Sequence, residues 1–196
     1  MINDNEQSQI NSRFEALKKV CGDCLTEEGG KLDAAFDFAK AAYQDKRKPS
    51  GELLIIHSLD VAHIVAYEIK LRSGSVIAAL LHDVISTPNE NIDQIVKLFG
   101  DDVATIVRGF KKLSLFHSEK VRLQSENFRR LFLSMVDDVR IIFIKMAHRL
   151  HDLRNFESLP ENLKKAFLND VQYLYIPIAH RLGLYQIKAQ LEDLAL

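Results

Sequence analysis

Residues 73–85 form a segment that is apolar almost all the way round, with two ionisable residues near its end. Its sequence is SGSVIAALLHDVI. A helix that is apolar on every face has to be buried, so this segment predicts a central helix against which the others pack. It carries His82 and Asp83 into the interior. An ionisable group there is costly unless it is paired, hydrogen-bonded or bound to a metal, so the fold must provide partners for both.

Apolar residues recur at three- and four-residue steps through most of the remaining chain, which is typical of amphipathic helices. Two apolar, β-branched stretches, 53–56 and 141–144, join such patterns, so we predict no strand. Gly29-Gly30 and Gly100 mark breaks, Pro160 suits a first helical turn, and Pro177 predicts a kink. The expected class is all-α, one domain of roughly nine or ten helices. The expected helices after the first break cover residues 32–43, 56–69, 73–85, 92–99, 102–113, 119–135, 139–156, 160–181 and a last one from 185.

The size and charge of the chain exclude several classes of protein. Its 196 residues suffice for one sizeable core, and a net charge of −1 argues against direct binding of nucleic acid over a broad surface. No apolar run approaches the ~20 residues that span a bilayer, and residues 1–9 lack the apolar core of a signal peptide. We therefore expect a cytoplasmic protein that does not bind membranes.

The two cysteines, Cys21 and Cys24, form a single C-x-x-C pair. A structural zinc site usually needs four ligands, and the sequence has no second pair. A thioredoxin-like site would need a βαβ context, which the pattern does not provide. We interpret the two cysteines as small residues near the end of a helix.

Histidines and an acid on separate helices indicate a metal site. His57, the pair His82-Asp83, and His148 lie in different predicted helices, and such side chains can converge on a cation in a helical core. A mixed nitrogen and oxygen set suits manganese, iron or zinc, and a bound metal lowers the pKa of its water. A nearby carboxylate usually takes the proton of that water. In this chain, Ser86 and Thr87 stand shortly after His82-Asp83, where a carboxylate would help to activate the water. The residue that would take the proton of the water is therefore missing.

The chain resembles the HD-domain metal phosphohydrolases and, more closely, the N-terminal hydrolase domain of the RelA/SpoT homologue family, the enzymes of the alarmone (p)ppGpp. The resemblance runs from about Ala34 to the end. The stretches that carry it are Ser50-Gly51-Glu52 through His57, Ala79 to Val84, Phe99 to Ala104, Glu126 to Arg129, Asp138 to Arg140, Ile144 to Ala147, Arg149 to His151, Ile178 to Gly183, and Glu192 to Ala195.

The resemblance implies an all-α HD-domain fold and removal of the 3′-pyrophosphate of ppGpp with Mn²⁺. Metal ligands carry over to His57, His82 and Asp83. The fourth ligand is an aspartate in the family pattern Ala-Asp-Arg-Leu-His-Asn, and His148 stands there in this chain. The family's Glu-Asp pair, which supports attack by water, falls on Ser86 and Thr87. The asparagine near the guanine base falls on Asp152.

These departures change the expected chemistry. Hydroxyl groups cannot act as general bases near neutral pH, and that role is worth roughly 10²–10⁴-fold in rate. His148 can ligate a divalent metal, yet it removes a negative charge and so weakens a hard Mn²⁺ site. It could instead fill the space without binding metal, so the presence of Mn²⁺ stays open.

Basic residues suggest a place for the phosphates of a guanine nucleotide (ppGpp, GDP or GTP). Lys145 and Arg149 lie four residues apart on the helix that carries His148, so they share its face. The resemblance adds the basic loop at Arg47 and Lys48, interrupted by Pro49. The full candidate set for nucleotide binding is Arg47, Lys48, Lys145, Arg149, His151, Asp152 and Asn155.

Three functional hypotheses follow. The first is a degenerate hydrolase domain with a regulatory or structural role in the stringent response. The chain would consist of an N-terminal helical extension (1–30) and an HD-type domain (31–196). It would be a fragment of a longer alarmone synthetase (GTP pyrophosphokinase), and the C-terminal synthetase domain of that chain would be its partner. The second is an active hydrolase in which another acid, such as Glu90, replaces the lost pair. The third is a guanine-nucleotide sensor without turnover.

Overall fold

The computed structural model describes residues 2–22, 29–84, 92–118 and 137–196, and the elements in these ranges are helices. The all-α prediction is therefore confirmed. The helix expected at 119–135 lies outside the described residues. In chain order the elements are α1 (Asp4–Cys21), α2 (Gly29–Tyr43), α3 (Leu54–Tyr67), α4 (Ser73–Leu81), α5 (Ile92–Ser118), α7 (Val139–Arg154), the 3₁₀ turn η3 (Phe156–Ser158), α8 (Glu161–Asp170), the π turn η4 (Val171–Tyr175), α9 (Ile176–Arg181) and α10 (Tyr185–Leu194). The helix count over these ranges is slightly below the nine or ten expected, because the two helices expected within residues 92–113 form the single element α5 and residues 119–135 are not described. No described helix is both long and apolar enough to cross a membrane.

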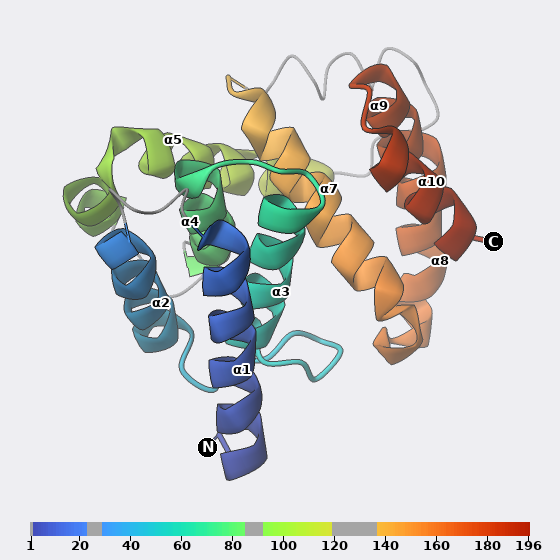
Figure 1. Ribbon diagram of the computed structural model, residues 1–196. Coiled ribbons are helices and arrows are strands. Elements are labelled where there is room, and N and C mark those ends of the chain that lie inside the picture. The colour runs from blue at the N-terminus through green and yellow to red at the C-terminus, as the bar shows by residue number, and fades with distance from the viewer. Residues whose placement is uncertain (1, 23–28, 85–91, 119–136) are drawn as a thin grey trace.

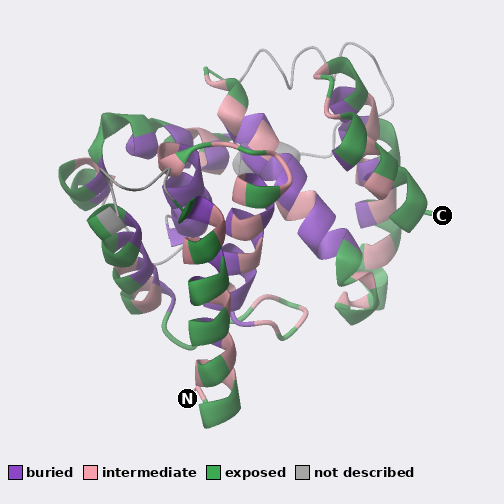
Figure 2. Ribbon diagram, in the orientation of Figure 1, coloured by how far each residue is buried: buried purple, intermediate pink, exposed green. Residues whose placement is uncertain are grey.

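The helices α3 and α4 form the centre of the molecule (Figure 1). The first helix, α1, packs on α3, and α4 packs between α3, α5 and α2. On the other side of α3 lies α7, whose far flank contacts η4 and α10. Buried residues concentrate along α3, α4 and α7 (Figure 2). The three segments that carry the predicted site residues are thus held side by side in the core.

The central helix α4 is buried along its length, as its sequence predicts. Residues 75–81 are all buried. The helix ends at Leu81, four residues before the expected end, with His82 at its C-cap. The hydroxyl of Tyr43 donates to the Leu80 carbonyl at 3.0 Å and accepts from the Asp83 backbone N–H at 3.2 Å. Because the last carbonyls of a helix lack partners within it, this hydroxyl stabilises the point where α4 ends.

Two predicted breaks in helical geometry are present in altered form. Gly100 has φ of 89°, outside the helical region and suited to glycine. The two expected helices around it appear as one kinked element, α5. The helix after Pro160 is irregular before Pro177, as expected, but the irregularity is the π turn η4. A proline lacks the N–H that a regular helix needs, and a π turn changes the hydrogen-bond register where that donor is missing.

The basic loop before α3 is closed on itself. An antiparallel bridge joins Arg47 to Leu53. Within it the Lys48 N–H donates to the Glu52 carbonyl at 2.8 Å, and Gly51, with φ of 87°, donates to the Lys48 carbonyl at 2.9 Å. These bonds fix Lys48 and Glu52 at the N-terminal end of α3, next to its first turn.

The N-terminal helix belongs to the same core. Ile10, Phe14 and Leu17 are buried, and the Phe14 ring stacks on Phe36 of α2 with 3.8 Å between ring centroids. Cys21, at the end of α1, is buried, which agrees with its interpretation as a small residue near a helix end. Cys24 lies outside the described residues.

Candidate metal centre

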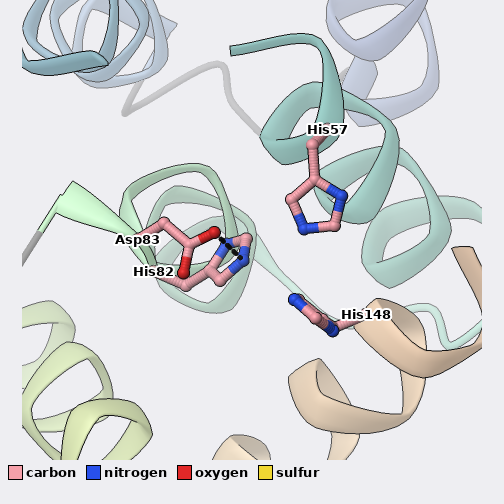
Figure 3. A group of neighbouring side chains, drawn as sticks. All are labelled: His57, His82, Asp83 and His148. Atoms are coloured by element: carbon pink, nitrogen blue, oxygen red, sulfur yellow. Dashed lines mark ion pairs between the residues drawn. The ribbon is translucent and has the colours of Figure 1, made fainter. Parts of the chain in front are cut away.

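Four side chains from three helices converge at the centre of the fold (Figure 3). His57 comes from the first turn of α3, His82 and Asp83 follow α4, and His148 comes from α7. Their candidate ligand atoms all lie within 4.8 Å of one another. We call this group the His–Asp cluster. The structure therefore brings together all four residues that the sequence suggested as ligands.

His82 is held in an orientation that suits a metal ligand. Its Nδ1 lies 2.5 Å from the Ala79 carbonyl oxygen, which can only accept, so Nδ1 carries the proton. In a neutral ring Nε2 is then a bare acceptor. That Nε2 lies 3.2 Å from Oδ2 of Asp83. Two acceptors facing each other in a buried site call for a cation, and a backbone carbonyl on the other ring nitrogen is the usual support of a metal-binding histidine.

The other two histidines also present buried ring nitrogens without partners. His57 Nε2 and His148 Nδ1 have no hydrogen-bond partner among the described residues. Burial lowers the pKa of His57 to about 4 and holds the pKa of His148 well below its usual value, so both rings are neutral near pH 7. Burial alone would raise the pKa of Asp83, but His82 outweighs it and the net pKa is lowered. The cluster thus combines the neutral imidazoles of His57 and His148 with an ionised carboxylate.

This donor set fits a divalent metal ion. Three imidazole nitrogens and one carboxylate oxygen are typical ligands of zinc, iron and related ions. The buried Nε2 atoms of His57 and His82, which have no hydrogen bond among the described residues, are the structural sign that a group is expected between them. The cluster supports metal binding without fixing which metal.

His57 also contacts charged groups on its opposite edge. Its Nδ1 lies 3.2 Å from Lys48 Nζ, 3.1 Å from His151 Nδ1 and 3.6 Å from Glu52 Oε2. His151 Nε2 lies in turn 3.3 Å from Glu52 Oε1 and 3.6 Å from Asp60 Oδ2. Burial alone would lower the pKa of His151, but these carboxylates and Asp152 raise it to about 10. Unlike His57 and His148, His151 is therefore a cation at neutral pH.

Asp152 lies between the two groups of side chains. Its Oδ1 forms an ion pair with Lys48, and its Oδ2 lies 3.3 Å from His148 Nδ1 and 3.9 Å from Arg149 Nη1. Burial acts to raise the pKa of Asp152, but His148, His151 and Lys48 reduce it well below the usual value. A buried carboxylate thus links the basic loop to the helix that carries His148.

The two other cations proposed for phosphates, the buried Lys145 and the partly exposed Arg149, lie beside aromatic rings. Lys145 Nζ lies 3.9 Å from the centroid of the Phe110 ring, and burial, with Arg149 nearby, lowers the pKa of Lys145 to about 7. The Arg149 guanidinium lies over the Tyr175 ring at 5.2 Å, with Asp170 Oδ2 at 3.9 Å. Both side chains lie on α7 within one turn of His148.

The remaining candidate residues lie elsewhere or outside the described residues. Arg47 pairs with Glu6 of α1 at 2.8 Å and donates to the Gly51 carbonyl. Asn155 donates to the His151 carbonyl at 2.9 Å at the end of α7, a capping contact. Ser86, Thr87 and Glu90 fall in residues that the structure does not describe.

Glu52 and Tyr43 are site residues that the sequence reasoning did not single out. Glu52 stands in the same motif as His57, five residues before it, so the spacing offered a signal for a paired acid. Tyr43 contacts Asp83 across forty positions of sequence, and nothing in the pattern around it indicates this.

A family model described as "HD domain" matches residues 35–185. The matched region contains all four residues of the His–Asp cluster and the helices that carry them.

Curated relatives are much longer than this chain. The bifunctional (p)ppGpp synthase/hydrolase SpoT of Escherichia coli K12 is 39% identical over 183 residues, which are 92% of this chain and 26% of that protein. The guanosine-3′,5′-bis(diphosphate) 3′-pyrophosphohydrolase of Vibrio cholerae is 38% identical with the same coverage. The GTP pyrophosphokinase of Myxococcus xanthus is 34% identical over 84% of this chain and 22% of its own length. The chain thus spans about a quarter of these relatives.

A solved structure, described as a metazoan orthologue of SpoT that hydrolyses ppGpp, matches with a TM-score of 0.64 and 23% identity. The match covers 84% of this chain and 93% of that one, and it shows that the fold is shared. With an HD-domain match over most of its length, the four clustered residues inside that match, and homologues of the SpoT/RelA type, the chain belongs to the HD-domain family.

Proposed function

We propose that this chain is a (p)ppGpp 3′-pyrophosphohydrolase-type domain that binds a divalent metal and a guanine nucleotide but has lost efficient hydrolysis. The observation that carries the proposal is a mismatch within one site. The His–Asp cluster has its four candidate ligand atoms within 4.8 Å of one another, while the two positions that resemble the family's acid pair are Ser86 and Thr87.

The geometry suggests which residues would bind the metal and which would bind the phosphates. His57, His82, Asp83 and His148 would hold the metal, and a metal so held would polarise a phosphoryl oxygen and acidify water. Lys145 and Arg149, on the same helix as His148, would contact phosphate oxygens as charged donors. No hydroxyl at Ser86 or Thr87 can accept the proton of the attacking water near pH 7, so binding would persist while turnover is lost.

A nucleotide sensor is the second candidate, favoured by the buried cations next to the His–Asp cluster. Lys48, Lys145 and Arg149 are each at most intermediate in exposure. Ammonium and guanidinium groups are the usual charged donors to phosphate oxygens, and these three gather beside the cluster. The two candidates share the binding site, and the sensor differs in that nucleotide binding without any turnover is itself the function of the domain.

We also propose that the domain is part of a longer protein and that this protein is cytoplasmic. Its relatives are about four times as long, and their printed names include a synthase and a GTP pyrophosphokinase. The proposal is that a synthetase domain of the same parent chain transfers pyrophosphate from ATP to GTP or GDP, and that this domain restrains or signals to it during the stringent response. Normal ppGpp synthesis by the parent after deletion of residues 1–196 would contradict the regulatory role.

The direct test is to restore the acids. Purified wild-type protein and the double variant Ser86→Glu, Thr87→Asp would be assayed for pyrophosphate release from ppGpp with Mn²⁺ or Zn²⁺. We expect the variant to exceed the wild type by roughly 10²–10⁴-fold, the usual worth of a general base. Thr105→Asp, which adds an acid at an exposed position of α5, should leave turnover at the wild-type level.

Rapid turnover by the wild-type protein would contradict the loss of hydrolysis and point to another base, with Glu90→Gln as the next variant. Calorimetry with ppGpp, GDP and GTP separates the remaining cases. Binding heat without pyrophosphate release would support the sensor, and the absence of heat with every nucleotide would exclude it.

A further inference from the structure

Asp152 and His148 lie one turn apart on α7, and their side chains meet in the core. Asp152 Oδ2 is 3.3 Å from His148 Nδ1, as the i,i+4 spacing on one helix face allows. Both side chains are largely buried, with 7% and 14% of their surface exposed. A buried carboxylate at this distance is the natural acceptor for a proton on that ring nitrogen.

The orientation of His148 divides its two ring nitrogens between different neighbours. One edge of the ring faces His57, His82 and Asp83 (Figure 3), and its ring centroid is 4.7 Å from that of His57 and 5.4 Å from that of His82. Nδ1 has no aligned hydrogen bond among the described residues, although Asp152 lies beside it. In a neutral imidazole one nitrogen must carry the proton, so a proton on Nδ1 leaves Nε2 free as a ligand.

We infer that Asp152 is a positioning residue, which accepts the Nδ1 proton of His148 and so holds Nε2 toward the metal. The unit is a carboxylate–histidine–metal arrangement, in which the carboxylate orients the ring and raises its basicity. The opposite oxygen of Asp152 is occupied by Lys48, which keeps the carboxylate in place.

This unit sets which metal the His–Asp cluster prefers. With His148 engaged, the cluster has three imidazoles and one carboxylate, a set that favours Zn²⁺ and similar nitrogen-preferring ions over the oxygen-preferring Mn²⁺.

The test is a set of metal affinities measured by chelator competition, with Co²⁺ as the spectroscopic probe for the nitrogen-preferring class and Mn²⁺ for the other. Asp152→Asn and Asp152→Ala should weaken Co²⁺ binding by about 10- to 100-fold, the usual effect of losing such a support. Asp170→Asn is the matched control, because it removes a carboxylate that also lies 3.9 Å from Arg149 and should leave the affinity unchanged. Equal affinities in the Asp152 and Asp170 variants would overturn the inference.

The preference itself is tested by His148→Asp. Because nearly all sites bind Co²⁺ more tightly than Mn²⁺, the quantity to compare is the ratio of the two affinities. We expect this ratio to fall at least tenfold from wild type to His148→Asp. An unchanged ratio would show that His148 is not a ligand.

A measurement without metal tests the orientation directly. Long-range ¹H–¹⁵N NMR spectra of the histidine rings in the metal-free protein should show His148 protonated at Nδ1, and the population should shift toward Nε2–H in Asp152→Ala. A wild-type ring protonated at Nε2 would overturn the inference. The inference rests on the metal-binding part of the proposed function. A wild-type protein that binds neither probe would refute both, whereas loss of turnover alone would affect neither the affinities nor the tautomer.

Discussion

The hydroxyl of Tyr43 donates a hydrogen bond to the Leu80 carbonyl at 3.0 Å, at the point where the buried helix α4 ends. The same oxygen accepts the backbone N–H of Asp83 at 3.2 Å. The Tyr43 side chain, from α2, thus provides a hydrogen-bond partner for backbone groups on both sides of the end of α4, next to the carboxylate of Asp83. The position of Asp83 depends on this contact as much as on α4 itself.

Removing that hydroxyl should destabilise the protein. Tyr43→Phe leaves the Leu80 carbonyl and the Asp83 N–H without their partner in the core, and we expect the free energy of unfolding to fall by about 1–3 kcal/mol. Urea denaturation of the metal-free protein measures the change. Tyr67→Phe is the control, since Tyr67 is 63% exposed, and a loss of similar size there would contradict the explanation.

Gly109 of α5 packs against the side chain of Ile141 in α7. A Cβ added at Gly109 would lie 2.1 Å from Cδ1 and 3.2 Å from Cγ1 of Ile141, a buried residue. Gly109→Ala should therefore lower the free energy of unfolding by about 1–3 kcal/mol through overpacking. Gly30→Ala makes the same change in α2, where nothing lies within 4 Å, and should be neutral or stabilising by up to about 1 kcal/mol. Matching effects in thermal denaturation would disprove the overpacking.

Metal binding should stabilise the fold through the His–Asp cluster. A divalent ion at a hundred times its dissociation constant adds about 2.7 kcal/mol to the free energy of unfolding, so Zn²⁺ should raise the Tm of the wild-type protein. His82→Ala should abolish that rise, whatever its own Tm. His63→Ala, on the same helix as His57 but with its ring beside Tyr67, should keep it. A rise that survives in His82→Ala would place the metal elsewhere.

The stability of the metal-free protein should fall on either side of neutral pH. The folded-state pKa of His57 is about 4 and that of His148 is also lowered. Their contribution is therefore lost as pH falls from about 6.5 toward 4, by about 1.4 kcal/mol per pH unit for each proton taken up. His151, with its pKa raised to about 10, contributes fully below pH 6.5, and its contribution declines as pH rises through 10. Urea titrations in EDTA from pH 4 to 9 measure both slopes, and His57→Gln should reduce only the acid one.

Binding of phosphate groups should weaken as pH rises through 7. Burial and the neighbouring Arg149 lower the pKa of Lys145 to about 7, so its charge is present below that pH and lost above it. Calorimetry with ppGpp between pH 6 and 8 should show the affinity falling across this range. Lys145→Arg keeps the charge throughout and should flatten the profile. A wild-type profile as flat as that of the variant would exclude Lys145 from the phosphate site.

Sequence reasoning predicted the central helix and the convergence of His57, His82, Asp83 and His148. Ionisable groups in apolar helices require partners, and the sequence contains few candidate partners. The roles of these four residues as ligands remain a prediction. The pattern could not reveal the ion pair of Lys48 with Asp152, which joins residues 104 positions apart. The sequence pattern also did not reveal the contact of Tyr43 with Asp83. Both contacts depend on how the helices pack against each other, which the pattern does not specify. The π turn before Pro177 was predicted only as a kink, because a proline indicates where a helix is disturbed but not the hydrogen-bond register that results.

The packing of α1 on α3 matters for how recombinant fragments are designed. The family match begins at residue 35, within α2, and a fragment cut there would lose Ile10, Phe14 and Leu17 from the core. Burial of each such side chain is worth about 1.5–3 kcal/mol. The cut would also remove Glu6, the partner of Arg47 in the basic loop. A fragment that starts before Asn3, whose side chain caps α1, should therefore stay folded during purification better than one that starts at residue 35.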